Sequence, residues 1–205
     1  MHRLELFHNR KLRVHPFALS GLFLILFVAK RIYAFAVLSS VILHELGHLI
    51  ASLLYHKRPE YIELMPTGIS IGLAPPSSYI EEIVIAAAGP LMNLLYIAAA
   101  SFFPSQLSET IKLVSLLLCF LNLLPLGDFD GGRILRAVLS ILLEETISFR
   151  ISQFITTICL AILWVLSLYI FFYSGVNMTL LIFCAYLFSY LILKRSCHDE
   201  ANMLK

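Results

Sequence analysis

The chain has 205 residues, of which 60% are hydrophobic and 14% are charged, whereas soluble domains average about 45–50% and about 25%. A soluble domain of this size leaves much of its surface in water, so it could not bury this many apolar side chains. The composition therefore excludes a soluble globular enzyme, a disordered chain and a polar secreted domain. The net charge is only +2, which gives no basic footprint for nucleic acid. We predict a membrane protein in contact with the lipid bilayer.

Six apolar runs approach or exceed the length of about 20 residues that a helix needs to cross a bilayer. These runs are 14–29, 32–55, 83–103, 111–126, 151–172 and 178–193. The first run follows basic residues, as the apolar part of a signal peptide does, but Lys30 and Arg31 lead directly into the second run without a small-residue cleavage site. We therefore interpret the first run as a retained span and predict six transmembrane helices.

Six spans place both termini and the segments 56–82 and 127–150 on the same side of the membrane. This side carries twelve Lys and Arg residues, and the other side carries three. An excess of Lys and Arg marks the cytoplasmic face, so both termini are predicted to be cytoplasmic. Arg133 and Arg136, within 127–150, are expected to extend toward lipid headgroups.

Between the second and third spans the pattern changes from continuous apolar runs to alternation. Residues 61–65 and 68–73 alternate apolar with small or polar side chains, and a Pro-Thr-Gly turn separates them. Alternation of period two on either side of a turn is typical of two short strands. Because an open strand edge cannot face lipid, we predict a β-hairpin that lies at the interface or is buried in protein.

The motif that carries the most chemistry is HELGH at residues 44–48. Residues four apart lie on one face of a helix, so His44 and His48 can bind the same Zn²⁺. Glu45 is beside them and can accept a proton from an attacking water. Ionisable residues inside a membrane span are costly and usually functional. The alternative is a polar cluster that holds helices together by hydrogen bonds.

A third ligand is expected, because catalytic zinc has three protein ligands and an open position. The fourth apolar run ends in NLLPLGDFDGGR, residues 122–133. Pro125 ends the helix and the glycines let the backbone turn. In the six-span topology this segment reaches the same depth as the two histidines. Asp128 and Asp130 can both present a carboxylate there, and their spacing does not distinguish them.

A second polar break, GPLMN at residues 89–93, interrupts the third apolar run. Pro90 frees backbone groups of the helix, and Asn93 carries an amide that can donate and accept hydrogen bonds. Gly89, Pro90 and Asn93 can contact the backbone or the oxyanion of a substrate. They can equally serve helix packing, for which small and amide residues are common.

Together HELGH, GPLMN and NLLPLGDFDGGR resemble the motifs of the site-2 protease family of intramembrane zinc metalloproteases, in the order that the family has them. The six spans and the VHPF sequence at 14–17 are most similar to the stage IV sporulation branch of that family. The resemblance implies zinc ligands at His44, His48 and Asp130, because the family's aspartate directly precedes its pair of glycines. It also implies that Glu45 is the general base.

The resemblance further implies that the hairpin at 61–73, with Ile69 and Ile71, guides an extended substrate by strand addition. Substrate contacts are then predicted for the GPLMN segment. The expected reaction is the cutting of a membrane-associated protein at the cytoplasmic edge of the membrane. A helical substrate must unwind first, since its carbonyls are hydrogen-bonded, so helix-breaking residues are expected near the cut.

For the sporulation branch, the resemblance implies a sigma-factor precursor of the pro-sigma-K type as substrate, membrane inhibitor proteins as partners, and termini on the mother-cell side. The alternatives are a site-2 protease that acts on an anti-sigma factor or on a signal-peptide remnant. An alternative from another class is a membrane metal transporter that uses the same three ligands.

The expected fold class is an all-α membrane protein of six transmembrane helices, with a short membrane-associated β-hairpin between the second and third. The whole chain, 1–205, is expected to be one domain, with its catalytic core at about 32–135. Members of this branch often carry a C-terminal CBS nucleotide-sensing domain. The sequence stops soon after the sixth apolar run, so no CBS domain is expected.

Overall fold

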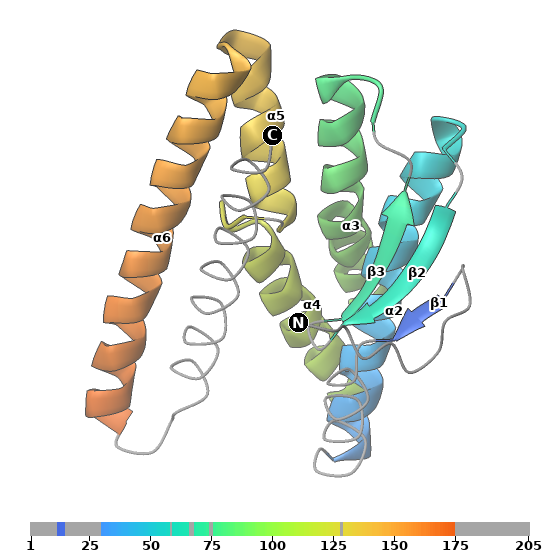
Figure 1. Ribbon diagram of the computed structural model, residues 1–205. Helices are drawn as coiled ribbons and strands as arrows, with labels where there is room; N and C mark the ends of the chain where they lie inside the picture. The colour runs from blue at the N-terminus through green and yellow to red at the C-terminus, as the bar shows by residue number, and fades with distance from the viewer. Residues whose placement is uncertain are drawn as a thin grey trace.

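The computed structural model describes residues 12–14, 30–57, 59–65, 68–73, 76–127 and 129–174. The described helices are α2 (Arg31–Leu54), α3 (Tyr79–Ala100), α4 (Gln106–Asn122), α5 (Asp130–Leu142) and α6 (Glu145–Ser174). Figure 1 shows α2, α3 and α4 as one group, with α5 continuing from the end of α4 and α6 returning beside α5. The predicted sixth span, and the predicted first span apart from Val14, lie outside the described residues.

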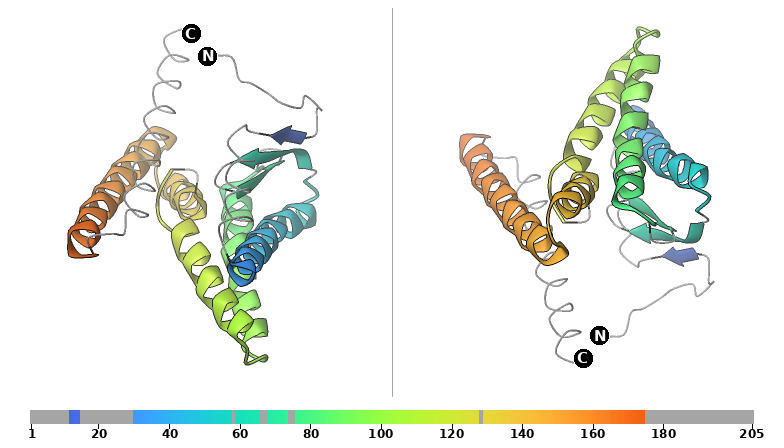
Figure 2. Two further views of the ribbon diagram at one scale, coloured as in Figure 1. Left: turned by 90° about the horizontal axis from the view of Figure 1, so that it is seen from below. Right: turned by 90° about the horizontal axis from the view of Figure 1, so that it is seen from above.

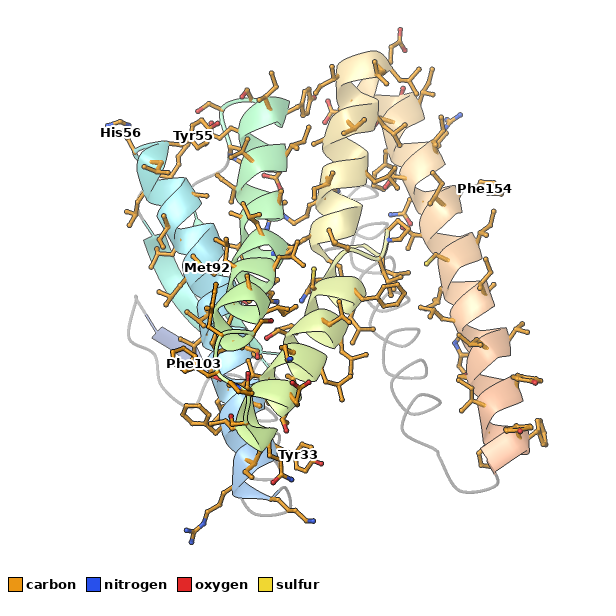
Figure 3. All side chains as sticks on the ribbon, turned by 180° about the vertical axis from the view of Figure 1, so that it is seen from behind. Tyr33, Tyr55, His56, Met92, Phe103 and Phe154 are labelled. Atoms are coloured by element: carbon orange, nitrogen blue, oxygen red, sulfur yellow. The ribbon has the colours of Figure 1, made fainter. Side chains whose placement is uncertain are left out.

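Three helices in the described part of the chain are long and apolar enough to cross a membrane, namely α2, α3 and α6. They correspond to the second, third and fifth predicted spans, although α6 begins six residues before its apolar run. Phe154 on α6 is 66% exposed and points away from the other helices (Figure 3). Helices with apolar side chains on their outward faces are typical of membrane spans.

Aromatic side chains lie at both ends of the helix group. Tyr33 and Phe103 lie at one end, and Tyr55 lies at the opposite end beside His56 (Figure 3). All four side chains are exposed. Tyrosines and other aromatic residues are typical of the two membrane–water interfaces. The two ends of the group therefore suit the two surfaces of a bilayer.

A small sheet lies beside α2 and α3 (Figure 2). Its strands are β1 (Leu12–Val14), β2 (Pro59–Met65) and β3 (Gly68–Leu73), in the order β1-β2-β3. β2 and β3 pair antiparallel in the segment where the sequence predicts two strands, with Leu64 opposite Ile69. β1 pairs parallel with β2 and has no counterpart in the sequence-based prediction. β3 contacts α2, so the sheet adjoins the helix that carries HELGH.

The segment 127–150 contains a helix that the sequence analysis does not predict. α4 ends at Asn122, and α5 begins at Asp130 after a non-helical segment. In that segment Gly127 has a φ of 47°, a conformation that favours glycine. The sequence predicts only a turn here that presents Asp130. The structure corrects this, because Asp130 is the first residue of α5. The missed signal is helical spacing of apolar residues, at Ile134, Leu135, Val138, Leu139 and Leu142.

The non-helical segment between α4 and α5 packs against α6 through Leu126 and Pro125. Leu126 is 2% exposed and packs against Leu160. The hydroxyl of Thr156 donates a hydrogen bond of 3.0 Å to the carbonyl of Pro125, and the N–H of Phe129 donates one of 2.9 Å to the carbonyl of Leu126. Irregular backbone inside a membrane protein requires such internal partners. α6 therefore stabilises the turn that leads to Asp130.

A buried hydrogen bond joins α2 to α4. The hydroxyl oxygens of Ser40 and Ser115 lie 2.8 Å apart, and both residues are fully buried. Hydrogen bonds between membrane helices average about 0.6 kcal/mol and reach about 1.7 kcal/mol. In a double-mutant cycle of Ser40→Ala and Ser115→Ala, we expect a coupling in this range in the free energy of unfolding in detergent micelles. Strictly additive effects of the two substitutions would contradict the bond.

Candidate metal centre

HELGH places two imidazoles on the face of α2 that packs against α3. His44 is 4% exposed and His48 is 7% exposed, and their Nε2 atoms lie 3.2 Å apart. Gly47 lets the two helices approach, because a Cβ there would lie 2.4 Å from the carbonyl oxygen of Ala88. The i, i+4 spacing and the small residue between the histidines thus bring both rings to the interface of α2 and α3.

The first residue of α5 completes the cluster. The Oδ2 atom of Asp130 lies 3.2 Å from Nε2 of His44 and 3.4 Å from Nε2 of His48. Asp130 is 5% exposed, and a carboxylate in the first turn of a helix is favoured by the helix dipole. Asp128, the alternative ligand, lies outside the described residues.

The donor set fits a zinc ion. The Oδ2 atom of Asp130 is buried, and it has no hydrogen-bond partner among the described residues. It faces two imidazole nitrogens, and the three residues form a group that can hold a metal ion. Two histidine nitrogens and one carboxylate oxygen are the ligand types of catalytic zinc sites, which keep a fourth position open.

The second nitrogen of His48 is held by the backbone of α3. Nδ1 of His48 lies 2.8 Å from the carbonyl oxygen of Ile85. A carbonyl oxygen can only accept, so Nδ1 carries the hydrogen and Nε2 keeps its lone pair. Such a partner on the outer nitrogen fixes the tautomer that a metal requires.

Asn93 is the corresponding partner of His44. It is fully buried, and its side-chain nitrogen lies 3.0 Å from Nδ1 of His44. The nitrogen and oxygen of an amide are distinguished only by their hydrogen-bond partners. If Oδ1 takes this position, it accepts a hydrogen from Nδ1 and leaves Nε2 of His44 free to bind a metal. The structure thus places Asn93 against a histidine of the cluster.

The backbone of α3 at Gly89 lies directly against both rings. A Cβ at Gly89 would lie 2.3 Å from Nε2 of His48 and 2.9 Å from Cε1 of His44. Such contacts leave no room for any other residue type. Pro90, which follows, is also buried in α3. The segment that the sequence assigns to substrate contacts therefore forms one side of the candidate metal centre.

Arg133, for which the sequence predicts only an extension toward headgroups, pairs with two carboxylates of the protein. Its Nε donates a hydrogen bond of 2.6 Å to Oε1 of Glu82 on α3. One of its terminal nitrogens lies 3.7 Å from Oδ1 of Asp130. The sequence analysis assigns no role to Glu82 or Ile85. In the sequence, the i, i+3 spacing of Asp130 and Arg133 is the signal that could have predicted a contact between their side chains.

Comparisons with known proteins find similar metalloproteases. The sequence profile of peptidase family M50 matches residues 98–166. Zinc metalloprotease MJ0392 of Methanocaldococcus jannaschii is 36% identical over 110 residues, which is 49% of this chain and 32% of that protein. Stage IV sporulation protein FB of Bacillus subtilis is 28% identical over 167 residues, which is 76% of this chain and 58% of that protein.

The fold is also similar to that of a known protease, over nearly the whole chain. The solved structure of a site-2 protease from Methanocaldococcus jannaschii matches with a TM-score of 0.64 and 25% identity, over 91% of this chain and 92% of that one. In sequence and in fold, the chain is similar to proteases of the site-2 protease family. These matches support the family resemblance seen in the three motifs, and the grouping of His44, His48 and Asp130 fits the zinc of the similar metalloproteases.

The chain spans 32% and 58% of the length of the two curated relatives. The profile match at 98–166 includes Asp130 but not HELGH. The fold match, over 91% of the chain, extends well beyond the residues that the profile matches.

The remaining predicted site residues lie on α2 or on the strand that contacts it. Glu45 is half-buried and follows His44 on α2. Ile69 and Ile71 lie in β3, the strand that contacts α2, and their side chains lie outside the described part of the structure. The sheet thus brings the strand that the family resemblance links to substrate close to the helix that carries Glu45.

Proposed function

We propose that this chain is a zinc endopeptidase that cleaves a membrane-associated protein near the cytoplasmic face of the membrane. The observation that supports this most is the convergence of Nε2 of His44, Nε2 of His48 and Oδ2 of Asp130. Glu45 follows the first of these ligands directly in the sequence. Together with the similarity to site-2 proteases, this arrangement favours peptide hydrolysis.

In the proposed mechanism, His44, His48 and Asp130 hold the metal ion. Zinc, when bound, polarises the scissile carbonyl and makes a water molecule more acidic. Glu45 accepts the proton from the attacking water and passes it to the leaving amine. Asn93 keeps the His44 imidazole in the orientation that binding requires.

β3 supports the delivery of an extended substrate. Among the described strands it is at one edge of the sheet, because the order is β1-β2-β3. A substrate strand that adds to β3, the strand of Ile69 and Ile71, would be read mainly through its backbone. Gly89, Pro90 and Asn93 are buried in α3, so a substrate contacts this segment only if it reaches the metal centre itself.

We further propose a sigma-factor precursor of the pro-sigma-K type as the substrate, with membrane inhibitor proteins as partners. Similarity to stage IV sporulation protein FB supports this assignment. The proposed topology is six spans with both termini cytoplasmic, supported by the excess of Lys and Arg on that side. The proposed catalytic core is about 32–135 within a single domain.

Co-expression tests the substrate. The chain is expressed with a membrane-tethered precursor of the pro-sigma-K type, and in parallel with an anti-sigma factor and a signal-peptide remnant. We expect a shortened product of the sigma-factor precursor on a denaturing gel. A product from one of the other two substrates would retain the protease and replace the proposed substrate.

Metal content tests the site independently of any substrate. We expect about one zinc ion per purified chain, because the geometry provides one set of three ligands. Asp130→Asn should weaken zinc binding by more than the 10–100-fold that loss of an outer partner costs. Glu145→Gln, an exposed carboxylate at the start of α6, is the matched control and should keep its zinc. Equal zinc content in wild type and Asp130→Asn would contradict the ligand assignment.

A further inference from the structure

One face of α3 contacts both histidines of the metal cluster and pairs with Arg133, which lies near Asp130. Its residues Glu82, Ile85, Gly89 and Asn93 follow one another at helical spacing. The carbonyl of Ile85 and the amide of Asn93 contact the two histidines, and Gly89 lies against both rings. Glu82, the first residue of this face, does not contact a histidine. Its partner is Arg133.

Arg133 connects this face of α3 to the third ligand. It lies one turn after Asp130 on α5, with its Nε on Oε1 of Glu82 at 2.6 Å and a terminal nitrogen 3.7 Å from Oδ1 of Asp130. The guanidinium is planar and carries several donors in fixed directions, so one group can face two carboxylates at once. The Arg133 and Glu82 side chains are 28% and 19% exposed, which places them at the edge of the buried centre.

The two oxygens of Asp130 therefore face different partners. Oδ2 faces the two Nε2 atoms, and Oδ1 faces the guanidinium. A carboxylate can rotate about its terminal torsion, which is broad, and an attraction on Oδ1 restricts this rotation. We propose that Arg133, held by Glu82, is a positioning residue that keeps Oδ2 of Asp130 directed at the metal. This inference depends on the proposed zinc site.

The opposite charges of the pair provide a direct test. Arg133→Gln removes a positive charge near a cation site, and Glu82→Gln removes a negative one. If the pair acted only through its charge, the first variant would bind zinc more tightly and the second more weakly. If the pair positions Asp130, both variants bind zinc more weakly, because either substitution releases the carboxylate.

The measurement is the dissociation constant for zinc of the purified full chain, by competition with a chromophoric chelator. We expect a 10–100-fold increase for Arg133→Gln, in line with the loss of other outer partners, and an increase of the same sign for Glu82→Gln. Arg136→Gln, also on α5 with an exposed side chain, is the matched control and should leave the constant unchanged. The melting temperature of the zinc-free variants shows whether each one folds.

Each outcome has a distinct meaning. Weaker binding in both variants, with Arg136→Gln unchanged, supports the positioning role. Opposite changes, or no change, in variants that fold would overturn it while wild type still binds zinc. If wild type binds no zinc, the proposed function itself fails. In the Asp130→Asn background the effect of Arg133→Gln should disappear, because the residue it positions is absent.

Discussion

We expect Glu45→Gln to abolish cleavage while the protein still folds and binds zinc. Glutamine has the size of glutamate but cannot accept the proton of the attacking water. General acid–base groups contribute about 10²–10⁴-fold to catalysis, so we expect a rate loss in this range. The rate is measured as product formed from a membrane-tethered substrate, with zinc content determined on the same preparation.

Glu109→Gln is the matched control for this substitution. Glu109 is an exposed carboxylate in the first turn of α4, where it pairs with Lys112. We expect its removal to leave cleavage unchanged. The same pair of variants also separates protease from metal transporter, since transport needs ligands but no general base. Unchanged cleavage by Glu45→Gln would exclude Glu45 as the base, and zinc flux that survives in this variant would favour transport.

Gly89→Ala is expected to disrupt the metal centre without touching a ligand. The new Cβ would lie 2.3 Å from Nε2 of His48, so the ring or the backbone of α3 must move. Overpacking of this kind costs about 1–3 kcal/mol. If this whole cost opposes zinc binding, the affinity for zinc falls by about 5–150-fold. Zinc affinity and cleavage should fall together.

The control for added volume is Ala98→Val on the same helix. Ala98 is exposed, so its extra methyl groups meet no side chain of the centre, and zinc binding should be unchanged. If Gly89→Ala binds zinc as tightly as wild type, the close contact between α3 and the two histidines is wrong.

Much of the fold and of the centre was predictable from local patterns. Continuous apolar runs predict α2, α3 and α6, because burial in lipid requires apolar side chains over the whole length of a span. The i, i+4 spacing in HELGH predicts that His44 and His48 share a face. Alternation predicts β2 and β3. These features depend on residues close together in the sequence.

The features that were missed depend on contacts between distant segments. β1 pairs with β2 across more than forty residues, and a strand of three residues has no pattern of its own. The Asn93 amide and the Arg133 side chain have several possible partners in the sequence. Only the packing of α3 against α2 and α5 determines that these partners are His44 and Glu82.

X-ray absorption spectroscopy of the zinc-loaded chain tests the central claim most directly, because it reports the ligands of the metal without a substrate. We predict a first shell of nitrogen and oxygen at about 2.0–2.1 Å, with the outer-shell scattering of two imidazoles. That shell should lose an imidazole in His48→Ala. A sulfur shell at about 2.3 Å, or no bound metal in the folded wild-type protein, would contradict a centre built from His44, His48 and Asp130.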